Sequence, residues 1–319
     1  MRCLTIALIL LFATGGARAD AWPERPVRMI APFPAGGAVD LMARLAADVL
    51  ARALGQPVFV DNRPGAGGNL GAELLAQAVP DGYTLGTMTI GSHGINPSVY
   101  RDLPFDPVRD FTPISLLVVQ PNVMVVPPSL GVTTVAQFVA LAKARPGQLN
   151  AGSPGYGTTL HLCAELFKQM TGTDIVHVPY RGTALALPDL LSGRLAVMFN
   201  NLPAVMPQIR AGALKALAVT ARERWPELPD VPTLEEAGLT GFDVSSWYAL
   251  MGPARLSRDK VETLNRAIVQ AFETDDMRAR LLEIGTRVAV GTPDQLGAFV
   301  AAEVTRWAAV VKATGLKVD

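Results

Sequence analysis

The chain has 319 residues, and its 28 lysine and arginine residues are balanced by 28 aspartate and glutamate residues. This neutral balance argues against nucleic acid as the main partner, because surfaces that bind nucleic acid carry a strong positive charge. A chain of this length exceeds the size at which a single core usually divides, so we expect two lobes. Of its two cysteines, only Cys163 lies outside the first 21 residues, which excludes an internal disulfide once those residues are removed.

Residues 1–21 are predicted to be a secretory signal peptide. Arg2 gives a positive start, residues 4–12 form an apolar run, and two small-x-small patterns allow cleavage after Ala19 or Ala21. The apolar run falls far short of the ~20 residues that span a bilayer. A membrane anchor or a buried N-terminal helix is the alternative interpretation. Export would place the mature protein in the periplasm of a host with two membranes.

The rest of the chain repeats one order of elements: strand, glycine-rich loop, helix, strand, glycine-rich loop, helix, strand. The first helix has its apolar residues on one face and is predicted to end at Gly55 and Pro57. The last helix is predicted to begin at Thr292, because Gln295 completes a capping box. Alternating strands and helices favour parallel sheets with short right-handed crossovers. The predicted strands are residues 27–33, 58–62, 83–90, 149–153, 174–180 and 194–200.

Two extended segments, residues 114–128 and 242–253, follow the first and the second repeat. We interpret them as two crossings between lobes that together form a hinge, which makes the first lobe discontinuous. Lobe 1 is then predicted to comprise residues 22–122 and 246–319, and lobe 2 residues 123–245. We expect an α/β fold in which each lobe is a mainly parallel sheet flanked by helices.

The loop "APFPAGGAVD" at residues 31–40 follows the first strand and contains no basic side chain. In parallel sheets, ligands bind at the carboxyl ends of the strands, where such loops lead into helix N-termini. There, unpaired backbone N–H groups and the helix dipole attract anions without a cation. Pro34 restricts the chain, Gly36 and Gly37 let backbone approach a ligand closely, and Asp40 is a candidate N-cap or first-turn carboxylate.

The loop "SPGYGTTLH" at residues 153–161 is the counterpart in the second repeat. Two helix N-termini that face each other across a cleft would suit a small carboxylate, or a ligand with two acid groups. Either glycine-rich loop could instead serve only to pack a helix closely on a sheet. The candidate ligand groups in this loop are the hydroxyls of Ser153, Thr158 and Thr159, the bare backbone of Gly155 and Gly157, and the ring of His161.

Further candidates stand near the ends of other strands. His93 follows the third predicted strand, and Tyr180 and Arg181 lie where the fifth one ends. Each of these side chains could contact a ligand or serve only the structure. Asn200 and Asn201 could donate amide groups to a ligand or cap the helix that follows.

The sequence shows no catalytic constellation. Ser153 lacks the G-x-S-x-G context of a nucleophile elbow, and a Ser153–His161 pair would lack an orienting acid. His177 is interpreted as a core residue, and the histidines have no metal-ligand spacing, so no metal is expected. No cofactor is expected either, because the spaced glycines of residues 65–71 are only a weak dinucleotide signal. A secreted α/β enzyme that acts on a small carboxylate is the alternative to a binding protein.

Several of these stretches resemble the Bug family, the extracytoplasmic receptors of tripartite tricarboxylate transporters. The resemblance covers essentially the whole mature chain and includes "APFPAGGAVD", "NRPGAGGNLGAE", "SPGYGTTLHL", "VPYRG" and "LPDVPTLEEAG". It implies a two-lobed periplasmic-binding-protein fold of the Venus-flytrap, type II-like kind. It also implies a receptor that closes on a small organic carboxylate and delivers it to integral membrane subunits of the transporter. We expect a monomer.

The ligand contacts of that family resemble the positions derived above. Known ligands of such receptors include di- and tricarboxylates, acidic amino acids and aromatic carboxylates, so the identity of the ligand stays open. Asn200 stands where relatives often carry an aspartate, which would make this pocket less acidic. The resemblance places at the ligand Phe33, Pro34, Ala35, Gly36 and Gly37 with Asp40 behind them, Ser92 and His93, Ser153 to His161 including Tyr156, and Tyr180 and Arg181.

Overall fold

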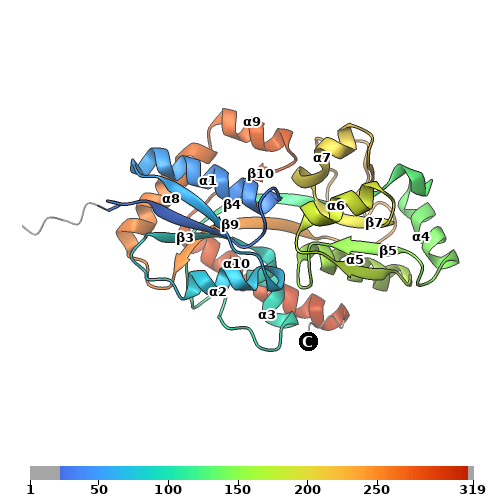
Figure 1. Cartoon of the computed structure of the whole chain (residues 1–319), viewed down its shortest axis with the longest axis horizontal. Coiled ribbons are helices and arrows are strands. Elements are labelled where there is room, and N and C mark those ends of the chain that lie inside the picture. The colour runs from blue at the N-terminus through green and yellow to red at the C-terminus, as the bar shows by residue number, and fades with distance from the viewer. Residues whose placement is uncertain (1–21, 315–319) are drawn as a thin grey trace, which may run out of the picture.

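The computed structural model describes residues 22–314, with side chains as far as residue 312, and its two lobes lie at opposite ends of the long axis (Figure 1). The predicted signal peptide lies outside the described residues. The strands are β1 (Val27–Ala31), β2 (Val58–Asn62), β3 (Thr84–Thr89), β4 (Phe111–Val126), β5 (Asn150–Ser153), β6 (Val176–Pro179), β7 (Val197–Asn201), β8 (Lys215–Val219), β9 (Ser245–Pro253) and β10 (Arg287–Val288). The helices are α1 (Ala38–Leu54), α2 (Asn69–Ala76), α3 (Asn96–Val99), α4 (Val135–Ala144), α5 (Thr159–Thr171), α6 (Thr183–Leu191), α7 (Leu202–Arg210), α8 (Arg258–Phe272), α9 (Asp275–Glu283) and α10 (Pro293–Thr314), with short turns η1 (Ala66–Gly68), η2 (Gly91–Ile95) and η3 (Pro128–Leu130).

The strands form one continuous sheet in the order β2-β1-β3-β9-β4-β7-β5-β6, and β8 and β10 also pair with β4. β1 is parallel to β2 and β3, and β5 is parallel to β6 and β7, as the alternation of strands and helices predicted. The two central strands, β4 and β9, run antiparallel to each other and to their outer neighbours β3 and β7. Each lobe is therefore a parallel sheet completed by antiparallel strands.

β4 and β9 are the two connections that carry the sheet from one lobe into the other (Figure 1). Residues 111–121 of β4 pair with β9, whereas residues 122–125 pair with β7. A strand of 16 residues spans about 50 Å, which is enough to cross from one lobe to the next. Both crossings that the two extended segments predicted are therefore present.

The ends of the helices follow the local signals in the sequence. α1 ends at Gly55, whose φ of 68° places it in the left-handed region that glycine tolerates best. Before α10, the backbone N–H of Thr292 donates to Gln295 Oε1 at 2.8 Å, and Gln295 N–H donates to Thr292 Oγ1 at 3.2 Å, so the predicted capping box is confirmed. β1 is shorter than predicted and ends at Ala31, because Pro32 has no N–H to continue the ladder.

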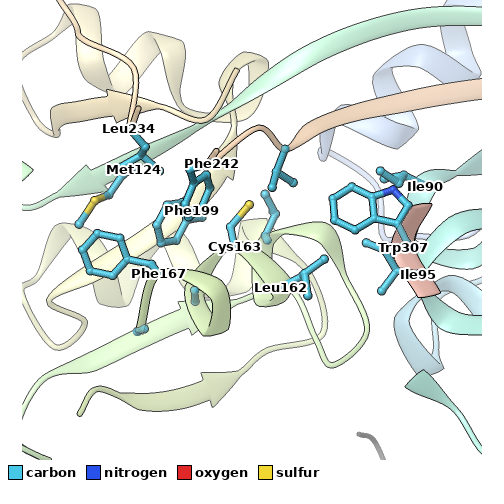
Figure 2. Packing of buried hydrophobic residues seen from close by; sticks show 14 of the residues in the cluster. Ile90, Ile95, Met124, Leu162, Cys163, Phe167, Phe199, Leu234, Phe242 and Trp307 are labelled. Atoms are coloured by element: carbon cyan, nitrogen blue, oxygen red, sulfur yellow. The ribbon is translucent and has the colours of Figure 1, made fainter. Parts of the chain in front are cut away.

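Buried side chains connect the two lobes on one face of the sheet and leave them separate on the other. One cluster contains Ile90 and Ile95 of lobe 1, Trp307 of α10, and Cys163 and Phe167 of lobe 2 (Figure 2). On the other face, the cluster beneath α1 and α8 is distinct from the cluster beneath α6 and α7. The apolar packing is therefore continuous along α10 and α5 and divided between α1 and α6.

Three features of the described residues bear on function. None of the helices between residues 22 and 314 is long and apolar enough to cross a bilayer. Within the same residues, no group of His, Cys, Asp and Glu side chains could hold a metal ion. Cys163 is buried on the apolar face of α5, as predicted, and burial raises the pKa of its thiol, which keeps it protonated and unreactive.

Candidate functional site

A cavity of about 60 Å³ lies between the lobes, where the loops that follow the parallel strands meet; it is called the main cavity below because several helices begin at its wall. Its wall contains the N-termini of three helices, α1, α5 and α6, which contribute residues 37–39, 158–160 and 182–185. The sequence predicted the first two of these helix starts at a ligand, and the third is added by the structure. The polar side chains of Thr89, Asn201, Ser246 and Tyr248 complete the wall from β3, β7 and β9.

The three helix starts present backbone donors to this cavity. The N-caps of α1 and α6 are Gly37 and Gly182, which have no side chain to occupy the first amides. Among the described residues, the N–H groups of residues 38–39, 159–160 and 183–184 have no hydrogen-bond partner. Unpaired amides and the positive ends of helix dipoles make each start a site of attraction for anions.

The loop before α1 is held from behind by Asp40. One carboxylate oxygen accepts hydrogen bonds from Gly36 N–H and from Arg44 Nε, both at 3.0 Å. The other accepts one from Asn62 Nδ2 at 2.9 Å, and the same amide nitrogen donates to Phe33 O at 2.9 Å. Asp40 is therefore a first-turn residue that fixes the loop, and it lies outside the wall of the main cavity. The N-cap, which Asp40 was a candidate to provide, is Gly37.

The electrostatics of this loop explain why Asp40 stays ionised. Burial alone would raise the pKa of its carboxyl, but hydrogen bonds from Arg44, Asn62 and the Gly36 amide hold the pKa below its usual value. The negative charge is also favourable in the first turn of a helix. Gly36 itself has a φ of 84° and lies beside Asp40 in a shallow depression, not in the main cavity wall. Phe33, Pro34, Ala35 and Gly37 do line the main cavity.

The loop before α5 is held by a stack of aromatic rings. Ser153 Oγ lies 2.6 Å from His177 Nε2 and accepts a hydrogen bond from Gly155 N–H at 3.2 Å. The ring of His161 stacks on His177 with 4.1 Å between centroids, and Tyr156 packs edge-on against both rings. The partner of Ser153 is therefore His177 and not His161. His177, interpreted from the sequence as a core residue, supports this loop.

The histidine pair is neutral at pH 7. Burial lowers the pKa of both His161 and His177 to about 4. Glu165 Oε1 lies 3.8 Å from His161 Nε2, too far for a hydrogen bond, and it pairs closely with Lys168 at 2.9 Å. Thr158 Oγ1 accepts the His161 N–H at 3.2 Å, so it caps α5. Thr158 and Thr159 line the main cavity, whereas Ser153 and His161 lie behind it.

Ser92 and His93 are placed inside lobe 1 and not at the cavity surface. Both are fully buried in η2, where Ser92 Oγ donates to Thr89 O at 3.2 Å and lies 2.9 Å from His93 Nδ1. The His93 ring packs edge-on against Phe111 at 4.3 Å and near Phe105. Burial lowers the pKa of His93 to about 3. The tight turn that follows β3 directs these side chains inward, so they support the cavity from behind.

The structure places Asn201, and not Asn200, in the cavity wall. Successive residues of a strand face opposite sides of the sheet, so only one of the two can point toward the ligand space. Asn200 is fully buried opposite Val123 in the register of β4 and β7. Asn201 Nδ2 donates to Asn122 Oδ1 and to Ser246 Oγ, both at 2.9 Å, which joins β7 to the two crossing strands.

A second, larger cavity of about 570 Å³ adjoins the main cavity, and Arg181 lines both. The predicted contacts Gly155, Tyr156 and Tyr180 lie in this second cavity. Tyr180 Oη donates to Asp189 at 2.6 Å, and burial together with that carboxylate raises the pKa of Tyr180 to about 12. The guanidinium of Arg181 has no hydrogen bond or ion pair within the described part of the chain, which leaves it available to an anion.

The loops of the two lobes touch at the rim of the second cavity. Tyr100 Oη of lobe 1 donates to the Tyr156 carbonyl oxygen at 3.4 Å. A Cβ atom added at Gly157 would overlap the side chain of Asn96, so the loop before α5 can lie this close to lobe 1 only with a glycine at position 157. The lobes are therefore closed on each other around the main cavity.

Sequence reasoning missed the polar side chains that β3 and β9 contribute to the wall. Thr89 is 4% exposed, and its Oγ1 has no hydrogen-bond partner among the described residues. Tyr248 Oη accepts a hydrogen bond from Gln120 Nε2 at 2.7 Å, and Ser246 Oγ donates to Asn122 Oδ1 at 2.8 Å. Thr89 could have been found as a polar residue at the end of a strand, but Ser246 and Tyr248 lie inside β9 and have no such signal.

Comparison with known proteins agrees with this architecture. A family model described as "Tripartite tricarboxylate transporter family receptor" matches residues 42–316. Over 318 residues the chain is 38% identical to the protein BugT of Bordetella pertussis, and the match covers 98% of each chain.

Two solved structures were determined with ligands. Rpa4515 of R. palustris with adipate is 40% identical, has a TM-score of 0.90, and the match covers 93% of this chain and 99% of that one. MatC of Rhodopseudomonas palustris with bound malate is 34% identical, has a TM-score of 0.86, and the match covers 91% of this chain and 100% of that one. The family match, the similarity to BugT and the shared two-lobed fold lead to one conclusion: the chain belongs to the Bug family of tripartite tricarboxylate transporter receptors, which are periplasmic solute-binding proteins.

Proposed function

We propose that this protein captures a small organic carboxylate in the main cavity between its lobes. The observation that carries the proposal is the meeting of three helix N-termini with unpaired amides around a wall that, among the described residues, contains no acidic side chain. Hydrogen bonds to a charged group contribute roughly 1.5–3 kcal/mol each, so about four of them, less the cost of association, would give micromolar or tighter binding. Two similar receptors hold adipate and malate, which supports the same ligand class here.

The captured acid would be delivered to integral membrane subunits of a tripartite tricarboxylate transporter. Membership of the receptor family supports this role. The mature protein would act in the periplasm as a monomer, after loss of the predicted signal peptide. It would return the ligand chemically unchanged.

Capture would involve rotation of the lobes about the two crossing strands. We propose the lobe boundaries expected from the sequence, at residues 122/123 and 245/246; they lie within one residue of the point where β4 exchanges its partner β9 for β7, which is between Pro121 and Asn122, and of Ser245, the last residue of β9 that pairs with β4. The separate apolar clusters beneath α1 and α6 would part on opening, while the continuous cluster along α10 would stay packed.

The alternative is an enzyme that uses Ser153, whose Oγ lies within hydrogen-bond reach of His177. Two observations weigh against it. Ser153 is fully buried, and the stacking partner of His177 is another neutral histidine and not an orienting acid. A receptor therefore fits the geometry better.

A panel of small acids tested by thermal shift would decide between these functions. A solute that binds the folded protein must raise Tm as its concentration rises. We expect carboxylates to do so, and mass spectrometry after denaturation to recover them unchanged. Conversion of the acid would support the enzyme. A panel in which only cationic or apolar solutes raised Tm would contradict the proposal.

A proline at the start of α1 would test the role of the backbone amides directly. Proline is favoured at the first helical position, where it removes an N–H without disturbing the helix, and Gly37 already has an extended conformation that suits a following proline. Ala38→Pro should weaken binding about tenfold, the loss of one charge-assisted hydrogen bond. Arg258→Pro makes the same change at the start of α8 and should leave the affinity unaltered. If calorimetry gave Ala38→Pro the same affinity as the unmodified protein, the backbone amide of residue 38 would not hold the ligand.

A further inference from the structure

The second cavity lies at the mouth of the space between the lobes. In the order of the sheet, β2 and β6 are the outermost strands, whereas the crossing strands β4 and β9 are central. The second cavity is lined by residues 64–68, which follow β2, and by residues 179–181, where β6 ends. The main cavity instead takes wall residues from β9 and from β3 and β7, which flank the crossing strands. The second cavity is therefore farther from the hinge than the main cavity.

The two cavities share part of their walls, because Phe33, Pro34, Pro154 and Arg181 line both. At about 570 Å³ the second cavity is wide enough to admit a small solute. Residues 64–68 on one side belong to lobe 1, and residues 179–181 on the other side belong to lobe 2, so opening of the lobes would widen it. A solute that comes from solvent at this edge of the sheet reaches the main cavity through the second one.

The wall of the second cavity offers little that would hold a solute firmly. Tyr100 Oη already donates to the Tyr156 carbonyl oxygen at 3.4 Å, and Tyr180 Oη donates to Asp189 at 2.6 Å. Most of the other wall residues are glycine and proline, which have no polar side chain. These features suit passage of a solute better than its retention. The aromatic side chains of this wall are Phe33, Tyr100, Tyr156 and Tyr180.

Arg181 carries the only charge on either cavity wall among the described residues. Its guanidinium forms no hydrogen bond or ion pair within residues 22–314. By contrast, Arg63 is paired with Asp61 at 2.9 Å, and Arg194 with Asp189 at 3.0 Å. An unpaired charge beside a cavity with low-dielectric walls attracts an approaching ion over about one Debye length, roughly 8–10 Å at physiological salt. The mouth of the interlobe space therefore favours the entry of anions.

We propose that the second cavity is an entry chamber and that Arg181 steers an anionic solute through it into the main cavity. This inference rests on the proposed function and adds the route and the residue that sets the rate of capture. Arg181 acts at long range before the lobes close, and the helix starts hold the acid afterwards. Removal of such a rim charge changes the association rate and its salt dependence, whereas removal of a contact to a bound ligand changes the dissociation rate.

Arg181→Gln tests the steering in the whole protein, with adipate, malate or the acid of the panel that binds most tightly as the probe. Stopped-flow tryptophan fluorescence, or exchange line shapes in NMR where fluorescence is silent, would give the association and dissociation rate constants separately. At low ionic strength, association should slow about fivefold to tenfold, and dissociation should change less than about twofold. The difference in association should shrink to about twofold or less near 1 M salt, where the Debye length is about 3 Å.

Two further variants separate the charge of Arg181 from its shape. Arg181→Lys keeps the charge but loses the planar fork that binds a carboxylate through two hydrogen bonds, so association should stay within about twofold of the unmodified protein. Arg181→Glu reverses the charge and should slow association more than Arg181→Gln does. The matched control is Arg266→Gln on the exposed face of α8, outside both cavity walls, which should alter neither rate. Circular dichroism and Tm would verify that each variant is folded.

The outcomes separate steering from capture. Faster dissociation of Arg181→Gln with unchanged association would show that Arg181 holds the bound acid, and it would overturn the steering role. Slow association that Arg181→Lys does not restore, a deficit that is the same at low and high salt, or rates that do not change at all would overturn it as well. Each of these results leaves carboxylate capture intact. If no acid bound the unmodified protein, the proposed function itself would fail, and this inference with it.

Discussion

The loops that lead into α1 and α5 present the same kind of surface to the cavity but are supported in opposite ways. The first is anchored by the ionised carboxylate of Asp40, which connects Gly36, Arg44 and Asn62. The second is anchored by the neutral rings of His161 and His177. The difference shows that presenting amides to an anion does not determine how a loop is held. It also means that the two loops should respond differently to mutation and to pH.

The largest effect is expected from loss of the charged anchor. Asp40→Ala removes the acceptor of three hydrogen bonds, which leaves the Gly36 amide without a partner and the Asn62 amide with Phe33 O as its only acceptor. We expect a loss of about 2–3 kcal/mol in the free energy of unfolding, together with weaker acid binding, because hydrogen bonds to a buried charge are expensive to lose. Chemical denaturation and calorimetry would measure both.

Arg44→Gln is the matched control for that change. Its side chain is half exposed and supplies only one of the three hydrogen bonds, so its removal should cost less than about 1 kcal/mol. Asp40→Ala with the stability and affinity of the unmodified protein would show that the loop before α1 needs no anchor.

An intermediate effect on stability is expected when the pH is lowered, because protonation of His161 and His177 opposes their burial. Their pKa is about 4 in the folded protein and 6.5 when unfolded, so between these values the unfolded state binds more protons. Stability is therefore fully present above pH 6.5 and is lost as the pH falls toward 4, by up to about 1.4 kcal/mol per pH unit for each histidine. The lowered pKa of Asp40 keeps the first loop anchored over the same range.

Replacement of His161 by an uncharged aromatic residue would show whether the loss of stability at low pH comes from the histidine pair. His161→Phe retains the stack on His177 but cannot take up a proton, so the slope of unfolding free energy against pH should become shallower between pH 6.5 and 4. Asn265→Ala, an uncharged change in α8, should leave the slope as it is. A slope identical in His161→Phe and the unmodified protein would mean that the pair titrates in the same way folded and unfolded.

The smallest effect is expected from the hydroxyl that joins the second loop to the histidines. Ser153→Ala removes contacts with His177 and the Gly155 amide. We expect a loss of about 1 kcal/mol in stability and a few-fold loss in affinity, because these hydrogen bonds are between neutral groups. Ser192→Ala removes an exposed hydroxyl at the end of α6 and should change neither. A loss as large as that of Asp40→Ala would show that the two anchors are equally strong.

Local signals in the sequence predicted much of the fold and part of the site. Gly55 and the Thr292–Gln295 pair mark helix ends because glycine and capping side chains act within a few residues. The glycine-rich loops before α1 and α5 were identified because the first amides of a helix lack internal partners wherever the helix lies. Asp40 was expected behind the first loop from the resemblance to the family, but the residues that support the second loop could not be predicted. The hydrogen bond between Ser153 and His177 joins two strands, and no local pattern records it.

What the sequence determined by itself, then, is the family, the alternation of strands and helices, and two of the helix starts at the cavity. Each of these depends on contacts between near neighbours or on patterns shared by relatives. Tertiary structure decided that Asn201 and not Asn200 reaches the cavity, and it brought the α6 start, Thr89 and Tyr248 to the same wall. The physical reason is that strand register selects which alternate side chains face the cavity, and packing of the two lobes selects which loops meet.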